Sequence, residues 1–246
     1  MAGIIELRNV NFSAQTRKII RDISYCFDEG KITALVGPSG CGKSTILKLS
    51  AGLLVPDNGE IFYKGKHMTA MSRKESLNFR HEAAFVFQDS ALWANQTLFQ
   101  ILELPLRVHY PKMSKVEREK RIETIISEVG YKKDLGIRPA QLSMGEQKLI
   151  AFARATICRP SLLFLDEWVE SLDEHSAGRL IRLVKKHNRE GGSVIFVCHD
   201  MRIINDISDI VVMILGGQIF LKLSKEQIRE DEDLRRYVEQ GMGMQA

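Results

Sequence analysis

The stretch Gly37-Pro38-Ser39-Gly40-Cys41-Gly42-Lys43-Ser44-Thr45 decides the fold of this chain of 246 residues. It matches the phosphate-binding pattern G-x-x-x-x-G-K-[ST] at every defined position. The apolar run at residues 32–36 predicts a buried strand before it, and residues 43–49 predict the first turns of a helix after it. The motif needs this strand–loop–helix context, so a glycine-rich turn that binds nothing is the weaker interpretation.

The composition of the loop explains how it would bind a polyphosphate. Glycines let the backbone approach the ligand and turn its N–H groups inward, and the helix N-terminus adds partial positive charge. Lys43 can reach the β- and γ-phosphates, and the Ser44 hydroxyl can ligate Mg²⁺. The residues expected to bind nucleotide here are Gly37, Ser39, Gly40, Cys41, Gly42, Lys43, Ser44 and Thr45.

Overall composition is that of an ordinary globular protein, long enough to form one α/β domain with a subdomain. With 35 basic and 31 acidic residues the net charge is +4, so we expect a mixed-charge surface and no nucleic-acid partner. No apolar run approaches the roughly 20 residues that span a bilayer, and no signal peptide is evident. The four cysteines lack metal or redox spacing, which is typical of a reducing cytosol. Another chain must therefore supply any membrane-spanning part.

Upstream of the loop, residues 1–36 are rich in strand signals. Ile5, Leu7, Val10 and Phe12 alternate irregularly, which suits an edge or bulged strand. If that strand folds back on the loop, the Phe12 ring can stack on an adenine. A core side chain on a strand is an equally good interpretation of Phe12.

Two carboxylates follow the apolar run at residues 162–165. Continuous apolar runs of this kind belong to parallel sheets covered on both faces, and ligands of such sheets bind at the carboxyl ends of the strands. Asp166 is therefore expected to face the Mg²⁺ held by Ser44, and Glu167 is the candidate base or orienter of the attacking water. Two solvated acids at a strand end are the alternative.

Polar residues also follow two other predicted strands. Gln88 comes directly after residues 83–87, and its amide oxygen can ligand Mg²⁺ or a water; an ordinary loop residue is the alternative. His199 follows residues 194–198 and can contact a γ-phosphate and polarise the water, although a structural histidine is the alternative.

A second helix N-terminus is marked by Ser143 and Glu146, which form a capping box around Met144 and Gly145. The exposed N–H groups of such a terminus are a potential phosphate site. A well-capped helix without a ligand is the simpler interpretation of this motif alone.

Residues 90–140 change character and predict an inserted helical segment. Ser114 opens a helix with a capping box, and Gly130 ends it. The apolar residues between 92 and 105 form either the core of this segment or a groove for a partner's helix.

Taken in order, these motifs resemble the nucleotide-binding (ATPase) subunit of ABC transporters over essentially the whole chain. The phosphate-binding loop corresponds to the family's Walker A motif, and Asp166-Glu167 to its Walker B acids. The other matches are Gln88 with the Q-loop, residues 142–146 with the signature sequence, residues 171–173 with the D-loop, His199 with the switch histidine and Phe12 with the adenine-stacking aromatic.

The resemblance implies an α/β fold, namely a P-loop NTPase-like core with a mostly parallel sheet, an antiparallel β subdomain and an inserted α-helical subdomain. Residues 1–246 would form a single ATPase domain. Residues 1–88 and 146–246 would supply the RecA-like core and the antiparallel part, and residues from about 89 to 145 the helical subdomain.

It also implies the activity: hydrolysis of ATP with Mg²⁺, coupled to transport. Glu167, His199 and Lys43 would be catalytic, and Ser44, Gln88 and Asp166 would face the metal. Two copies, or one copy and a second ATPase subunit, would sandwich ATP between the loop of one and Ser143, Gly145 and Glu146 of the other. An integral membrane permease would dock in the groove beside Gln88, at the cytoplasmic face of the inner membrane.

Three positions depart from the family's common pattern. Met144 replaces a frequent glycine, Glu146 the usual glutamine, and Trp168 a common proline. Glu146 keeps the capping geometry but adds negative charge near a triphosphate. We hypothesise that these departures slow hydrolysis or make it depend on the partner.

Residues 88–93, 104–109 and 234–238 look like those of ATPases from lipid-trafficking transporters of the mammalian-cell-entry (MCE) type. A phospholipid or other hydrophobic cargo is the corresponding expectation. A soluble ABC ATPase of cofactor assembly, or a regulatory module that binds ATP with weak turnover, is the alternative. The direction of transport does not follow from the sequence.

Overall fold

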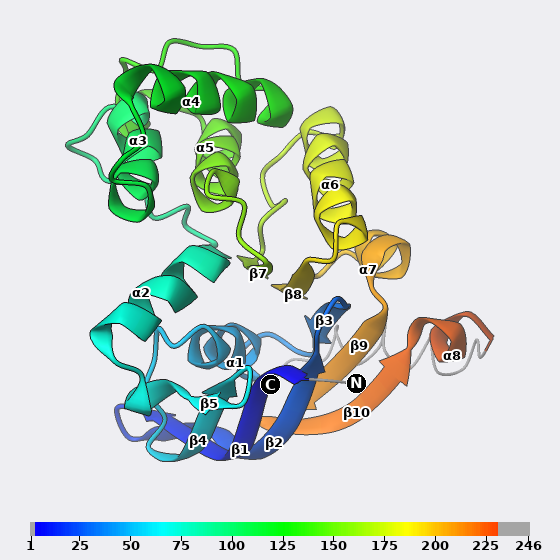
Figure 1. Cartoon of the computed structure of the whole chain (residues 1–246). Coiled ribbons are helices and arrows are strands. Elements are labelled where there is room, and N and C mark those ends of the chain that lie inside the picture. The colour runs from blue at the N-terminus through cyan, green and yellow to red at the C-terminus, as the bar shows by residue number, and fades with distance from the viewer. Residues whose placement is uncertain (1–2, 231–246) are drawn as a thin grey trace.

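A computed structural model of the chain describes residues 3–230, in which a mostly parallel sheet forms the core (Figure 1). This six-stranded sheet has the order β10-β9-β3-β8-β7-β6. Its strands are β3 (Ile32–Val36), β6 (Ala83–Val86), β7 (Leu162–Asp166), β8 (Ser193–Val197), β9 (Ile210–Leu215) and β10 (Gln218–Ser224). All neighbouring strands are parallel except β9 and β10, which pair as an antiparallel hairpin. The predicted parallel core is confirmed.

Burial on both faces explains why β3, β7 and β8 read as continuous apolar runs, because every residue in them is buried. Successive side chains point to opposite faces of a strand. In β7, Leu163 and Leu165 belong to the core beneath the helices, whereas Leu162 and Phe164 belong to the core on the other face. The carboxyl ends of these strands are thereby held rigidly.

A four-stranded antiparallel sheet packs beside this core and has the order β2-β1-β4-β5. Its strands are β1 (Gly3–Ala14), β2 (Arg17–Asp28), β4 (Asn58–Tyr63) and β5 (Lys66–His67). The predicted antiparallel subdomain is confirmed. Of the two alternatives expected for the first strand, the edge strand is excluded, because β1 pairs with β2 on one side and β4 on the other. The expectation of a bulged strand is confirmed by register shifts between Leu7 and Val10.

The capping residues predicted at Ser114, Gly130 and Ser143 are where the structure has them, at ends of α4 and α5. The α-helices are α1 (Lys43–Ser50), α2 (Arg73–Glu82), α3 (Leu98–His109), α4 (Lys115–Val129), α5 (Met144–Thr156), α6 (Glu174–Arg189), α7 (Met201–Ile207) and α8 (Lys225–Glu230), with short 3₁₀ turns at Met68–Ala70 and Pro139–Gln141. Ser114 and Ser143 both make the two hydrogen bonds of a capping box. Gly130 ends α4 with a left-handed φ of 79°.

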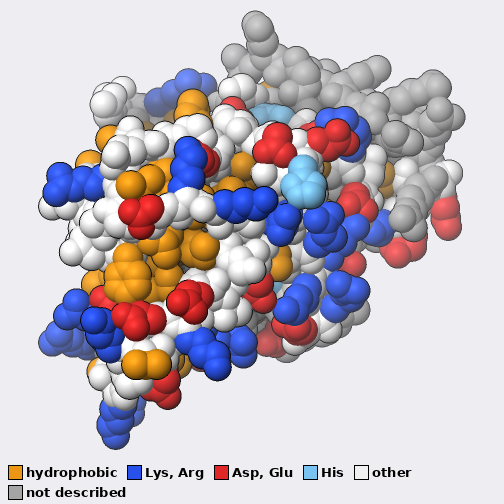
Figure 2. Space-filling model, turned by 90° about the horizontal axis from the view of Figure 1, so that it is seen from above, with side chains coloured by type: hydrophobic (Ala, Val, Ile, Leu, Met, Phe, Trp, Pro, Cys, Tyr) orange, Lys and Arg blue, Asp and Glu red, His pale blue; other side chains and the backbone are white. Residues whose placement is uncertain are grey.

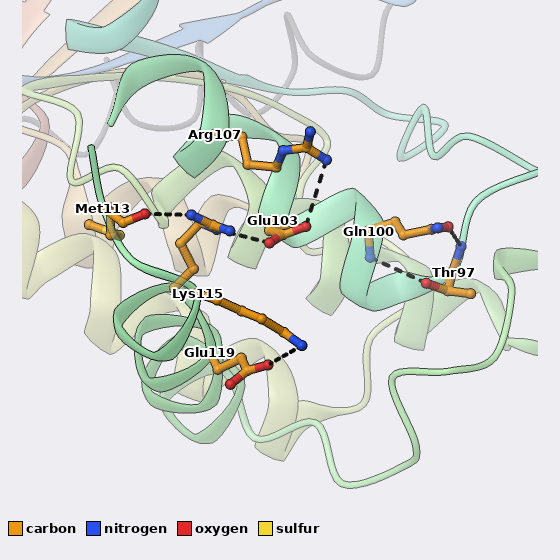
Figure 3. Close-up of polar contacts among 8 residues, drawn as sticks. Thr97, Gln100, Glu103, Arg107, Met113, Lys115 and Glu119 are labelled. Atoms are coloured by element: carbon orange, nitrogen blue, oxygen red, sulfur yellow. Dashed lines mark hydrogen bonds and ion pairs between the residues drawn. The ribbon is translucent and has the colours of Figure 1, made fainter. Parts of the chain in front are cut away.

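Helices α3, α4, α5 and α6 lie together on one side of the molecule, and the antiparallel sheet lies on the other (Figure 1). A partly buried ion pair holds α3 to α4: Arg118 donates to a Glu103 carboxylate oxygen at 2.8 Å and also to the carbonyl of Met113 (Figure 3 labels Glu103 and Met113). Thr97 and Gln100 cap the start of α3 in the same view. The predicted inserted helices are therefore present and fixed to one another.

Trp168, at the position where the resemblance expects proline, is a core residue. Its side chain is fully buried and stacks on Phe152 of α5, with ring centroids 5.9 Å apart. The departure therefore adds packing between the end of β7 and α5 rather than a group that reaches the nucleotide.

The surface is mixed in charge where Figure 2 shows it. Lysine and arginine are interspersed with aspartate and glutamate, and hydrophobic side chains gather among them on one part of this face. The segment at residues 234–238, one of those compared with lipid-transport ATPases, lies outside the described residues.

Candidate active site

The phosphate-binding loop leaves β3 at Val36 and enters α1 at Lys43, as predicted. Gly37 and Gly42 have left-handed φ values of 144° and 107°. A Cβ on Gly37 would lie 2.2 Å from the carbonyl oxygen of Ile214, and a Cβ on Gly42 would lie 2.7 Å from Cδ1 of Ile20. Both conformation and close packing therefore require glycine at these two positions.

Lys43 is the charged group at the centre of the loop. Its side chain is buried, and its ammonium donates to the carbonyls of Gly37 and Pro38, both at 2.8 Å. The ammonium is thus already held over the loop, and it can exchange these neutral acceptors for the stronger anionic oxygens of a phosphate.

A hollow of about 410 Å³ lies beside the loop, against the turn between β9 and β10. Arg17, Lys18 and Arg21 line it together with Gly40 and Cys41. The three basic residues suit a polyphosphate. They are not part of the motif, and only the folding of the β1–β2 hairpin brings them here.

Phe12 lies on β1 opposite Ile20 of β2, half-buried against the core. Both interpretations made from the sequence are compatible with this position. Stacking of Phe12 on an adenine stays a prediction.

Ser44 and Asp166 meet at the carboxyl end of the sheet. The Ser44 hydroxyl donates to Oδ1 of Asp166 at 2.8 Å, and Asp166 is fully buried. Burial raises the pKa of Asp166, while the Ser44 hydrogen bond and nearby lysines oppose the shift. A buried carboxylate and a hydroxyl are hard oxygen ligands, so this pair fits Mg²⁺.

Glu167 and His199 also meet here, with Oε1 of Glu167 3.0 Å from Nε2 of His199. Burial, together with the charges of Asp166 and Glu170, raises the pKa of Glu167 to about 7. Burial and the charge of Lys43 lower the pKa of His199. A carboxylate with a pKa near neutrality is suited to accept a proton from water at physiological pH.

The backbone at Glu167 is strained, with a left-handed φ of 42°. Such conformations cost a few kcal/mol in non-glycine residues and concentrate at functional sites. The Glu167 N–H donates to the carbonyl of Val197 in β8 at 3.2 Å, which fixes the residue beside His199.

Gln88 follows β6 and is oriented by Glu170. Its amide nitrogen donates to Oε2 of Glu170 at 3.2 Å. Because the carboxylate accepts from the NH₂ group, the amide oxygen is the atom left for a metal or a water. No pattern in the sequence points to Glu170, since it acts only through a residue 82 positions away.

The N-terminus of α5 carries the signature residues. Glu146 Oε2 accepts from the Ser143 N–H at 2.9 Å and from its hydroxyl at 3.1 Å. Glu146 Oε1 lies 2.7 Å from the ammonium of Lys133, which lowers the pKa of the carboxyl. The charge hypothesised to oppose nucleotide binding is thus paired, which the sequence does not reveal.

Met144 and Gly145, the two middle residues of the signature sequence, differ in whether their surroundings leave room for a side chain. A Cβ on Gly145 would lie 2.9 Å from the carbonyl oxygen of Ser171, whereas Met144 is 70% exposed. A glycine is therefore required only at Gly145, which explains how Met144 is accommodated.

A phosphate-binding loop, a buried acid beside its serine, and a strained glutamate next to a histidine at neighbouring strand ends together define a P-loop nucleotide hydrolase. The chain belongs to the ABC transporter family, whose model matches residues 20–170. It is an ATP-binding and ATP-hydrolysing cassette of that family.

Relatives and solved structures agree with this assignment. The chain is 36% identical to the nickel import ATP-binding protein NikE of Brucella suis biovar 1 (strain 1330), over 84% of this chain and 79% of that protein. It is 31% identical to the intermembrane phospholipid transport system ATP-binding protein MlaF of Haemophilus influenzae, over 95% and 88%. A dimeric post-hydrolysis structure of the cassette MJ0796 bound to ADP and Pi is 27% identical, with a TM-score of 0.84 over 90% of this chain and 98% of that one.

No helix among residues 3–230 has both the length and the apolar character needed to cross a bilayer.

Proposed function

We propose that this chain is the ATPase subunit that powers a membrane transporter, and that two copies sandwich ATP. The observation that carries the proposal is the meeting of Ser44, Asp166, Glu167 and His199 at one edge of the sheet. The second copy, or a second ATPase subunit, would bring Ser143, Gly145 and Glu146 to the phosphates. The dimeric MJ0796 structure supports this arrangement, as does the exposure of Ser143 at the start of α5.

The residues divide the chemistry between binding and proton transfer. Lys43, the loop amides and Thr45 bind the phosphates, and Ser44, Asp166 and Gln88 hold the metal through oxygen atoms. When bound, Mg²⁺ would neutralise the negative charge that develops on the phosphates. Glu167 orients or deprotonates the attacking water, and His199 polarises it and contacts the γ-phosphate.

Coupling to a permease requires a docking surface, and a hollow of about 640 Å³ lies on the helical side of Gln88. Phe87, Ala91, Trp93 and Val108 line it, and the Trp93 and Val108 side chains are 44% and 47% exposed. We propose that a helix of an integral membrane permease lies in this groove, which places the chain at the cytoplasmic face of the inner membrane. For this purpose the whole chain acts as one domain, with residues from about 89 to 145 forming the helical part.

For the cargo, we propose a phospholipid or another hydrophobic molecule. The phospholipid transport relative aligns over nearly the whole chain, including the groove segments that resemble those of MCE-type ATPases. The nickel import relative has higher sequence identity over a shorter span. Import of a metal ion is therefore the alternative cargo that the experiment must distinguish from a lipid.

The test is purification of the tagged full chain from detergent-solubilised membranes of its own cells, with mass spectrometry of bound proteins and extracted lipids. We expect an integral membrane subunit and an enriched phospholipid. Recovery with a permease but without enriched lipid would overturn the cargo. Recovery only outside the membrane fraction would overturn the transport role and favour cofactor assembly or a regulatory ATP-binding module.

A further inference from the structure

Lys148, in the second turn of α5, is a buried lysine that joins two parts of the active site. Its ammonium donates to the carbonyl oxygen of Gln88 and, at 2.9 Å, to the carbonyl oxygen of Glu167. The residue is only 3% exposed. The segment after β6 and the end of β7 are thus held by a single charged group.

A buried ammonium is costly unless it is hydrogen-bonded and compensated, so its presence here needs a reason. Burial lowers the pKa of Lys148, and the surrounding carboxylates of Glu170, Asp166, Glu167 and Asp89 oppose that shift. These acids lie at the end of β7 and on the two loops that Lys148 connects. The cation therefore fits this position electrostatically as well as geometrically.

Both ends of the connection have strained backbone. Ser90 and Ala91, just after Gln88, have left-handed φ values of 62° and 44°, and Glu167 has one of 42°. Strained conformations of non-glycine residues persist only where the surrounding contacts over-determine them. The hydrogen bonds that Lys148 of α5 donates to both segments are contacts of this kind.

A second cation of α5 provides a comparison. Arg154 donates to the carbonyls of Ala91 at 2.6 Å and Ser90 at 3.2 Å, and its guanidinium lies 5.4 Å from the centre of the Trp93 ring. Arg154 therefore anchors the same loop from the groove side. Of these two cations, Lys148 is the one that donates to Glu167.

We propose that Lys148 is a positioning residue that sets Gln88 and Glu167 relative to each other, so that displacement of the groove-lining loop is transmitted to the catalytic carboxylate. Ala91 and Trp93 line the groove, Arg154 and Lys148 tie that loop to α5, and Lys148 continues the connection to Glu167. The same helix carries Ser143 at its start. The inference rests on the proposed catalytic role of Glu167.

The primary test is hydrogen–deuterium exchange on the full chain, which does not depend on turnover. In Lys148→Met we expect the amides of Ser90, Glu167 and Glu170 to exchange faster by about tenfold or more, because both loops lose a charged donor. Lys148→Arg should restore protection at both sites. In the matched control Arg154→Met, exchange should rise at residues 90–91 and stay at the wild-type rate at residues 167–170.

The second test separates positioning from general packing. In Lys148→Met, kcat for ATP hydrolysis should fall by about tenfold or more while KM for ATP changes little, and Lys148→Arg should recover most of the loss. Unchanged exchange at residues 167–170 in Lys148→Met would overturn the inference even if Glu167 is essential. Normal turnover by Glu167→Gln would instead remove the proposed role of Glu167, and would leave the exchange result standing.

Discussion

The Ser44 hydroxyl lies 2.8 Å from Oδ1 of Asp166, although the two residues are 122 positions apart in the chain. Ser44 lies in the first turn of α1, which follows β3, and Asp166 ends β7, two strands away in the sheet. This contact brings together the two oxygen groups that a magnesium ion bound to a triphosphate requires.

Ser44→Ala and Asp166→Asn should therefore abolish the Mg²⁺ dependence of nucleotide binding. We expect kcat/KM to fall by about 100-fold or more, since charge stabilisation at the phosphates is lost. Calorimetry of ATP binding with and without EDTA measures this. Ser44→Thr, which keeps the hydroxyl and which the motif allows at this position, is the control; hydrolysis that resists EDTA in the wild type would contradict the assignment.

Glu167→Gln should bind ATP and stop turning it over, because the amide cannot accept a proton from water. The expected product is a long-lived closed dimer, visible by gel filtration with ATP and Mg²⁺, with kcat lower by about 100-fold or more. His199→Ala should also reduce turnover, and it should also form a long-lived closed dimer with ATP and Mg²⁺. A Glu167→Gln protein with wild-type turnover would exclude this residue as the base.

The raised pKa of Glu167 also predicts how stability depends on pH. Its pKa is about 7 in the fold against a usual value of 4.5. The folded state binds the proton more tightly, so this contribution is fully present below the usual value and is lost as pH rises through about 7. Without nucleotide, wild type should lose up to about 3 kcal/mol relative to Glu167→Gln between about pH 5 and pH 8. Urea unfolding of both proteins across this range is the measurement, and parallel curves would contradict the prediction.

The ion pair between Lys133 and Glu146 bears on the hypothesis that the acidic residue of the signature sequence slows ATP hydrolysis. Glu146→Gln should hydrolyse ATP faster, and Lys133→Ala slower, because removing the lysine leaves an unpaired negative charge near the triphosphate. When Glu146 is already replaced by Gln, the additional change Lys133→Ala should leave kcat/KM unchanged. A double-mutant cycle on kcat/KM at low and high salt tests this, and additive effects would show that the two charges act independently.

Gly145→Ala should destabilise the protein by about 1–3 kcal/mol, because the new Cβ would press on the Ser171 carbonyl. Met144→Ala is the matched control on the same helix turn. It should change stability by no more than about 0.5 kcal/mol, since Met144 is exposed. Thermal unfolding in the absence of nucleotide measures both, and equal effects would contradict the packing explanation.

Local patterns predicted much of the fold correctly. The phosphate-binding loop, the capping boxes at Ser114 and Ser143, and the left-handed end at Gly130 all depend on residues within a few positions of one another. Buried strands were recognisable from their continuous apolar runs. For β1 the sequence left an edge strand and a bulged strand open, because irregular alternation reports bulges and does not report how many neighbours a strand has.

The sequence by itself determined the class of this protein, because a nucleotide-binding loop and its flanking strand and helix are contiguous and carry their own chemistry. Only the tertiary structure decided which distant groups complete the site. Glu170 accepts a hydrogen bond from Gln88, and Lys133 forms an ion pair with Glu146. Lys148 donates to the carbonyls of both Gln88 and Glu167. Such contacts depend on strand order and helix placement, which bring together side chains that share no local spacing. A charge whose partner lies far along the chain looks, in the sequence, like any other surface charge.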